Sequence, residues 1–254
     1  MNLLHAAIIL LAGFVAGMIN SVAGGGTLLT FPILVWLGRA PIPANATNAV
    51  AICPGSFASM IGFRREIRDS RRWLLLLGLP SAAGAVVGAI LLLRTPPATF
   101  ETLVPLLILG ATILFAAQEP LIRLLRLDPE SPRSNAWWAG AIVFQFFVAL
   151  YGGYFGAGMG ILMLAALALL GLTDIHRMNG LKNFFAACIN GVAAIYFIWR
   201  GSIIWPDAIV MIVGTIAGGY GGAGIARRLG RGFVRRAVVF IGLAMTLSLF
   251  FKRL

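Results

Sequence analysis

Two glycine clusters occupy corresponding places in the two halves of this chain, and each is followed at once by a short apolar run. The first reads NSVAGGGTLLTF (residues 20–31) and the second reads GAGMGILML (156–164). A helix that begins after such a break leaves its first N–H groups without intrahelical partners, and these groups attract anions together with the helix dipole. We therefore predict an anion site at the two breaks, formed by Gly24, Gly25, Gly26, Thr27, Gly156, Gly158, Gly160 and Ile161.

Polar side chains near the breaks extend the predicted site. Amide and hydroxyl groups donate hydrogen bonds to an anion, and a lysine supplies one full positive charge. The set comprises Asn20, Ser21, Thr47, Asn48, Asn179, Lys182 and Asn183. Two alternatives stay open: Lys182 as a helix-end lysine that reaches the membrane surface, and the asparagines as helix caps or interhelical hydrogen-bond partners.

The residues of common enzymes are missing from the sequence. It contains no HExxH, GxSxG, Walker A or CxxC pattern, and its eight acidic residues fall in or near the predicted loops. A membrane enzyme needs acids, bases or metal ligands at depth, and a cation transporter usually needs buried carboxylates. We therefore expect no catalytic residues, no metal and no cofactor, and an anion as the ligand.

The elements that hold these residues are predicted from composition. Of the 254 residues, 60% are hydrophobic and 11% are charged, with a mean hydropathy of +0.94. A soluble domain carries about 25% charged residues, so the chain is predicted to be an all-α integral membrane protein surrounded by lipid. The net charge of +12 does not indicate a nucleic-acid partner, because the basic residues cluster between apolar runs, where they set membrane topology.

Charge placement favours ten membrane crossings with both termini external. With ten crossings, 15 of the 20 basic residues lie on the cytoplasmic side. Fusing each short run with its predecessor gives eight crossings and a smaller excess of basic residues on that side. Short helices that enter and leave by the same face give the same charge pattern as ten crossings. The predicted apolar runs are 3–22, 27–38, 44–63, 73–93, 101–117, 136–153, 159–172, 180–199, 203–225 and 237–251.

The order of these runs predicts two inverted repeats of about five hydrophobic segments each. A polar segment, 118–135, is the expected cytoplasmic linker between a first repeat (1–117) and a second repeat (136–254). An odd number of crossings per half turns the second half over, and offsets of 134 or 135 residues align the glycine breaks. The short helices after the breaks are expected to be broken or re-entrant. Other glycines at four-residue spacing, including Gly13, Gly17, Gly84 and Gly88, are assigned to helix packing.

The segments GFVAGMINSVAGGGTLLTFPILVWLG, ANATNAVA and HRMNGLKNFFAACINGVAAIYFIWRGSIIW resemble the sulfite exporter TauE/SafE family. This resemblance implies a permease of the bacterial cytoplasmic membrane for small organic or sulfur-containing anions such as sulfite or sulfonates. Alternating access of a central site is the expected mechanism. A proton or sodium ion is the expected coupling ion, and a homodimer is a candidate assembly. The alternative function is a non-transporting membrane scaffold or assembly subunit.

Overall fold

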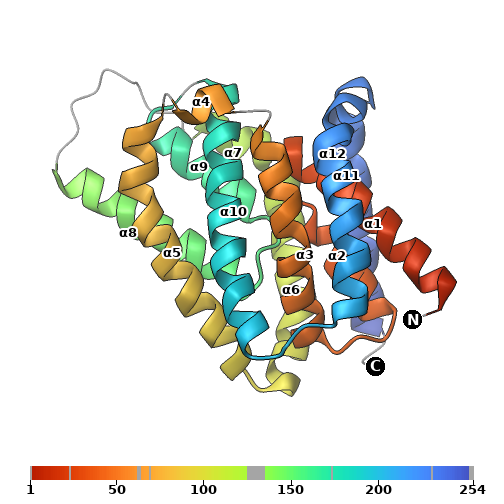
Figure 1. The fold of residues 1–254 in the computed structure, drawn as a ribbon. Coiled ribbons are helices and arrows are strands. Elements are labelled where there is room, and N and C mark those ends of the chain that lie inside the picture. The colour runs from red at the N-terminus through yellow and green to blue at the C-terminus, as the bar shows by residue number, and fades with distance from the viewer. Residues whose placement is uncertain are drawn as a thin grey trace.

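A computed structural model describes residues 2–22, 24–61, 64–68, 70–124, 135–172, 174–229 and 231–251. The described chain is helical and has no strands (Figure 1). Ten of the predicted linker residues, 125–134, lie outside the described residues. The helices are α1 (Leu3–Val22), α2 (Thr27–Trp36), α3 (Pro41–Ile61), α4 (Arg64–Arg68), α5 (Arg71–Arg94), α6 (Pro97–Ala116), α7 (Gln118–Leu124), α8 (Asn135–Tyr154), α9 (Met159–Leu169), α10 (Ile175–Trp199), α11 (Trp205–Leu229) and α12 (Arg231–Phe251).

Several of these helices are long and apolar enough to cross a membrane. In the described part of the chain, length and composition single out four spans: Leu3–Ser21, Arg71–Arg94, Pro97–Ala116 and Ile175–Trp199. Large apolar side chains on the outside of the bundle, such as Leu79 and Phe240, are exposed as they are in a protein that contacts lipid. The protein is therefore an all-α membrane protein, as the composition predicts.

The two short runs form short helices. Helix α2 has 10 residues and α9 has 11. At 1.5 Å per residue each is about 15 to 17 Å long, which is about half of a hydrocarbon layer roughly 30 Å thick. Most side chains of both helices are buried, so surrounding protein shields them from lipid.

The polar segments 45–48 and 179–183 lie inside α3 and α10, and both helices begin before the predicted apolar runs, which start at 44 and 180. Helix α10 begins earlier because the Asp174 side chain caps it, accepting a hydrogen bond from the His176 N–H at 2.9 Å. Helix α3 begins at Pro41, whose fixed φ suits a first helical position. The polar side chains of both helices consequently project from rigid elements and not from loops.

Helices from the two halves of the chain are interleaved. Helix α1 packs along α11, and α5 packs along α8, while α3 and α10 adjoin each other at the centre (Figure 1). In the predicted repeat α1 corresponds to α8 and α5 corresponds to α11. The pairing of α1 with α11 therefore has the pairing of α8 with α5 as its counterpart, as the predicted inverted repeat requires. The Cys53 thiol of α3 also lies 3.7 Å from the carbonyl oxygen of Ala187, 134 residues further along the chain. The repeat itself remains a prediction.

Close glycine contacts make the interleaving possible. A Cβ on Gly13 of α1 would lie 2.7 Å from the Met211 carbonyl oxygen of α11, and one on Gly84 of α5 would overlap the Phe146 carbonyl oxygen of α8. Neither distance is available to a real side chain, so the helices approach this closely only because these residues are glycines. The packing role predicted for these spacings is confirmed.

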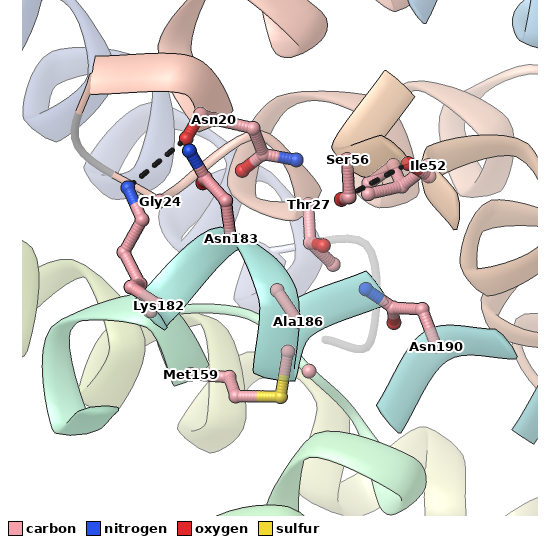
Figure 2. Close-up of a pocket in the computed structure, with 12 residues that line it drawn as sticks. Asn20, Gly24, Thr27, Ile52, Ser56, Met159, Lys182, Asn183, Ala186 and Asn190 are labelled. Atoms are coloured by element: carbon pink, nitrogen blue, oxygen red, sulfur yellow. Dashed lines mark hydrogen bonds between the residues drawn. The ribbon is translucent and has the colours of Figure 1, made fainter. Parts of the chain in front are cut away.

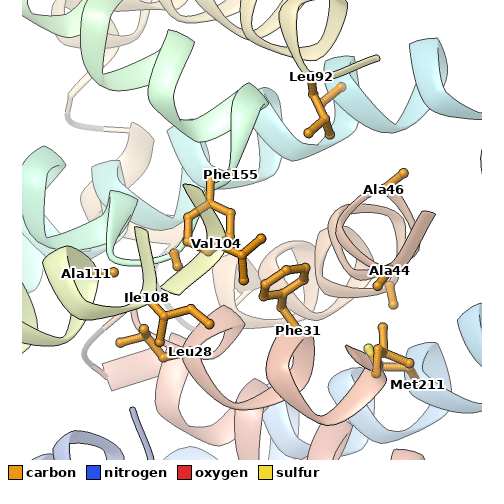
Figure 3. Packing of buried hydrophobic residues seen from close by; sticks show 14 of the residues in the cluster. Leu28, Phe31, Ala44, Ala46, Leu92, Val104, Ile108, Ala111, Phe155 and Met211 are labelled. Carbon is orange, nitrogen blue, oxygen red and sulfur yellow. The ribbon is translucent and has the colours of Figure 1, made fainter. Parts of the chain in front are cut away.

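Aromatic and aliphatic side chains from both halves meet beside the short helices. Phe31 of α2 packs edge-on against Phe155, which directly follows α8, with ring centroids 5.2 Å apart (Figure 3). Leu28 of the same short helix and Ile108 of α6 lie beside them in this core. This contact fixes the first short helix against the second glycine break.

One ion pair links the halves at an end of the bundle. Arg39, in the loop before α3, donates two hydrogen bonds to Asp207 in the first turn of α11, at 2.6 and 3.1 Å. The Asp207 side chain is fully buried, and these hydrogen bonds raise the pKa of Arg39 above its ordinary value. The loop between α10 and α11 lies at the end of the bundle opposite to α4 (Figure 1), so the pair joins the halves at that end.

Candidate functional site

Each glycine break begins with a left-handed glycine that ends the preceding helix. Gly24 has φ +77° and donates its N–H to the Ile19 carbonyl, and Gly156 has φ +76° and donates its N–H to the Tyr151 carbonyl. Such glycines commonly close helix C-termini, because side chains other than glycine are strained at positive φ. The glycines therefore turn the chain out of α1 and α8 so that the short helices can start in the protein interior.

The two breaks contact each other at the centre of the molecule. A Cβ built on Gly24 would lie 3.0 Å from the Cα of Gly160, and one on Gly160 would lie 3.0 Å from the Cα of Gly24. Backbone from the two halves therefore packs against backbone with no intervening side chain. This proximity brings the start of α2 and the start of α9 to one place.

Asn20, near the end of α1, forms hydrogen bonds with the start of α2 and with Lys182 of α10. Its side-chain oxygen accepts a hydrogen bond from the Gly26 N–H at 2.8 Å, so it caps the start of α2. Its backbone carbonyl accepts a hydrogen bond from the Lys182 ammonium at 3.2 Å. One residue thus holds the first break against the charged side chain of α10.

Lys182 is buried, with a relative exposure of 1%. Its aliphatic stem runs past Gly24 and Gly160, and its ammonium reaches the Asn20 carbonyl (Figure 2). The interpretation of Lys182 as a lysine that reaches the membrane surface is wrong. The predicted topology counted this lysine among the basic residues of the cytoplasmic loops. The predicted number of basic residues in those loops is therefore too high by one.

A small cavity lies beside this lysine. Its walls come from both breaks and from the central helices α3 and α10 (Figure 2). The space inside it that a water-sized sphere can occupy is about 20 Å³, close to what one water molecule needs, so a larger solute fits only when the walls move apart. The described residues that line it are Asn20, Gly24, Thr27, Ile52, Ser56, Gly156, Met159, Gly160, Lys182, Asn183, Ala186 and Asn190.

The amide nitrogen of Asn183 is buried and has no hydrogen-bond partner in the protein. Asn183 is 3% exposed and lines the cavity. An unpaired buried donor costs about 1 to 3 kcal/mol, so proteins seldom retain one without a ligand or water to accept its hydrogen bond. With Lys182 next to it, Asn183 offers a charge and a hydrogen-bond donor to the same small volume.

Seven of the fifteen predicted site residues line this cavity, and eight do not. The seven are Asn20, Gly24, Thr27, Gly156, Gly160, Lys182 and Asn183. The eight others are Ser21, Gly25, Gly26, Thr47, Asn48, Gly158, Ile161 and Asn179.

Most of these eight have identifiable structural contacts. Asn48 donates to the Thr27 hydroxyl at 3.3 Å and accepts a hydrogen bond from the Thr30 hydroxyl, which fixes α3 to the first turn of α2. Thr47 accepts a hydrogen bond from the Ile204 N–H at 2.9 Å, just before α11. Ser21 donates to the Met18 carbonyl at 2.8 Å.

The remaining members of the eight pack around the breaks. A Cβ on Gly25 would collide with the ring of Phe115, and Gly158 lies beside Ala111. Asn179 donates to the Ile175 carbonyl at 2.9 Å, while its buried side-chain oxygen has no partner. These positions therefore shape the breaks without contributing to the walls of the cavity.

Several N–H groups that we predicted to be free for an anion are bonded within the protein. The Gly26 N–H donates to Asn20, and the Ile161 N–H donates to the Gly158 carbonyl at 2.9 Å. The Met159 N–H donates to the Gly156 carbonyl at 3.2 Å. The prediction of free N–H groups at Gly26 and Ile161 is wrong, because the Asn20 cap and a tight turn satisfy them first.

Five residues of the cavity wall were not among the predicted site residues: Ile52, Ser56, Met159, Ala186 and Asn190. Helical spacing could have predicted some of them from Asn183. Asn183, Ala186 and Asn190 are separated by three and four residues and so share one helix face. Ile52 and Ser56 are four residues apart on α3. Ala186 and Asn190 follow them at the same offset of 134 residues that aligns the glycine breaks.

No carboxylate is found among the described residues that line the cavity. Nor does the described part of the chain hold a cluster of three or more His, Cys, Asp or Glu side chains that could bind a metal ion. The charge in the cavity wall therefore comes from Lys182. A wall with one cation, two amide side chains from α10 and exposed glycine backbone favours a small anionic ligand over a cation.

The fold and this cavity define a class, that of multi-pass membrane proteins with a polar cavity at the meeting point of two helix breaks. Comparison with known families is more specific, because the model of the family described as "Sulfite exporter TauE/SafE" matches residues 9–249. The chain belongs to this family of membrane proteins.

Three curated relatives are similar over most of their length. A "Probable membrane transporter protein" of Haemophilus influenzae is 29% identical, over 97% of this chain and 95% of the relative. "Probable membrane transporter protein YfcA" of Escherichia coli K12 is 26% identical, over 96% and 89%. "Probable membrane transporter protein ORF9" of a Sinorhizobium species is 24% identical, over 96% and 91%. No solved structure matches the chain. Family and relatives agree on the class of membrane transporters, to which this chain also belongs.

Proposed function

We propose that the protein is a secondary transporter that carries small organic or sulfur-containing anions, such as sulfite or sulfonates, across the bacterial cytoplasmic membrane by alternating access. The observation that carries this proposal is the cavity at the contact between Gly24 and Gly160. It is lined by the Lys182 ammonium and by the unpartnered amide of Asn183. The name of the family supports sulfur oxyanions as the first compounds to test.

The proposed substrate contacts are the residues that line the cavity. An anion there accepts a charge-assisted hydrogen bond from Lys182 and hydrogen bonds from Asn183 and Asn190, while the Ser56 hydroxyl donates to the Ile52 carbonyl. Glycine backbone beside Lys182 permits close approach of the ligand. The predicted residues outside the cavity wall hold the breaks in place.

Alternating access fits the position of the cavity between elements of both halves. The Arg39–Asp207 pair joins the halves at one end of the bundle, and near the other end Arg177 of α10 donates to the Ser70 hydroxyl at 2.7 Å. We propose that relative rocking of the halves loosens these contacts in turn. The cavity is then exposed first to one face of the membrane and then to the other.

Uptake of radiolabelled sulfite, sulfoacetate, methanesulfonate and acetate into proteoliposomes tests the proposal. We expect saturable uptake of at least one sulfur anion, and loss of at least tenfold in rate with Lys182→Ala. Arg94→Ala is the matched control, because Arg94 is an exposed cation at the last turn of α5 and lies away from the cavity. Unchanged kinetics in Lys182→Ala overturn the site. Absence of all flux, with stability that depends on a partner protein, supports the scaffold function instead.

A further inference from the structure

Lys182 carries a charge that no other described side chain of the cavity wall balances. Its ammonium contacts the uncharged Asn20 carbonyl at 3.2 Å, and its stem is enclosed by the backbone of Gly24 and Gly160. The cavity wall contains amides, hydroxyls, a thioether and aliphatic groups besides this lysine. The charge inside the cavity is therefore set by Lys182 and by whatever solute occupies the volume.

The titratable and charged groups on the elements that pack against α10 lie outside the described cavity wall. Cys53 of α3 points at the Ala187 carbonyl, and Tyr151 of α8 donates to the Ala157 carbonyl at 2.6 Å. The others whose side chains are described are His5 on α1, Arg64, Glu66 and Arg68 on α4, Arg71, Arg72 and Arg94 on α5, Tyr154 on α8, and His176, Arg177, Cys188 and Tyr196 on α10 itself.

A buried ammonium without a counter-charge is costly. Removing an ion from water costs several kcal/mol even after the protein relaxes, and a buried lysine responds by giving up its proton. When a singly charged anion enters the cavity, the ammonium gains the counter-charge it lacks. The loaded cavity is then neutral with the proton present, and the empty cavity is neutral with the proton gone.

We propose that the protein carries each anion together with one proton, which Lys182 holds as an ammonium beside the anion and releases when the anion leaves. This inference rests on the proposed function and names the coupling ion of the same site. The empty carrier returns with Lys182 as the neutral amine. One anion and one proton cross in the same direction in each cycle, so no net charge moves.

The same charge balance predicts a preference between anions. A monoanion neutralises the single ammonium, whereas a dianion leaves one negative charge in a cavity that has no second cation among its described residues. Singly charged sulfonates are therefore the preferred class. Transport of a dianion such as sulfoacetate by this cavity is slower, or responds to membrane voltage.

Methanesulfonate is the suitable probe, because its acid is strong and does not cross the bilayer as a neutral molecule. Wild-type protein in proteoliposomes is tested with the voltage held at zero by potassium and valinomycin and with the outside one pH unit more acidic. We expect radiolabelled methanesulfonate to accumulate up to tenfold, with acidification of an internal pH dye at one proton per anion. A voltage imposed without a pH gradient produces no accumulation.

Lys182→Arg separates charge from proton release, since an arginine guanidinium stays protonated in proteins. We expect the ratio of gradient-driven accumulation to anion exchange to fall at least tenfold in this variant. A role of Lys182 in packing alone lowers both rates together. Should the variant fail to purify as a monodisperse protein, the proton count on the wild type decides the matter.

The outcomes distinguish this inference from the function on which it rests. Net methanesulfonate uptake that ignores the pH gradient, or that occurs without proton uptake, overturns proton coupling and leaves transport standing. Net uptake driven by sodium in place of protons has the same consequence. Absence of any exchange of methanesulfonate and of the other anions overturns both.

Discussion

Gly24 and Gly160 belong to different halves of the chain, yet each would place a Cβ only 3.0 Å from the Cα of the other. This contact joins the two helix breaks, and the cavity wall includes both residues. Any side chain added here forces the breaks apart or pushes into the space that we assign to the substrate.

Alanine at either position is expected to impair the protein. Two effects destabilise Gly24→Ala. The added Cβ overlaps Gly160, and Gly24 has φ +77°, a left-handed conformation that costs a residue with a side chain about 1 to 2 kcal/mol. We therefore expect a larger fall in the thermal unfolding midpoint for Gly24→Ala than for Gly160→Ala, and loss of anion uptake in both. Gly78→Ala in α5 is the control, since a Cβ there meets no atom within 4 Å. Equal midpoints for Gly24→Ala and Gly78→Ala contradict the packing argument.

Asn20 variants are expected to separate stability from transport. Asn20→Ala removes the cap on the Gly26 N–H, which lowers the free energy of unfolding by about 1 kcal/mol. Asn20→Asp keeps the acceptor for that N–H but places a carboxylate in the residue that Lys182 contacts. We expect Asn20→Asp to match the wild type in thermal midpoint and to lose at least tenfold in anion uptake. Equal uptake by Asn20→Asp and wild type counts against an anion beside Lys182.

Asn183→Ala tests whether the unpartnered amide binds the substrate. A hydrogen bond to a charged group is worth about 1.5 to 3 kcal/mol, so its loss raises the apparent KM for anion uptake roughly tenfold or more. Stability is expected to change little, because no protein group pairs with the amide nitrogen of Asn183.

Gln145→Ala is the matched comparison for that variant. Gln145 is also a buried amide, but its nitrogen donates to the Ser81 hydroxyl at 2.8 Å and it lies outside the cavity wall. We expect this variant to lose stability without a change in KM. The opposite pattern, with KM altered in Gln145→Ala and unaltered in Asn183→Ala, argues against the proposed substrate contacts.

The Arg39–Asp207 pair is expected to behave as a partly buried ion pair. Arg39→Ala leaves the fully buried Asp207 carboxylate uncompensated, which costs about 3 kcal/mol in free energy of unfolding. Asp207→Asn costs less, because the Arg39 side chain is 26% exposed and retains access to water. The double variant Arg39→Ala with Asp207→Asn is expected to be more stable than Arg39→Ala alone. Simple additivity in thermal unfolding measurements, with no recovery in the double variant, rules out this coupling.

The sequence by itself determined the membrane class, the ten apolar helices and the two breaks, but it did not predict the short helices α4 and α7. Hydrophobic length and positive φ at glycine are local properties, so 27–38 and 159–172 were identifiable as short helices before any packing was known. Helices α3 and α10 begin at Pro41 and Ile175, before the predicted apolar runs, and in α10 the polar residues His176 and Asn179 interrupt the apolar pattern while remaining inside the helix.

The tertiary structure decided which of the polar residues share a cavity. The predicted repeat matches Asn48 with Asn183, yet Asn48 forms hydrogen bonds with Thr27 and Thr30 while Asn183 lines the cavity. The direction in which a polar side chain points depends on how its helix is rotated against neighbours distant in sequence. The hydrogen bonds that occupy the Gly26 and Ile161 N–H groups depend on the same packing and turn geometry. Composition and spacing carry no direct information on either, because both depend on contacts that form only when the two halves come together.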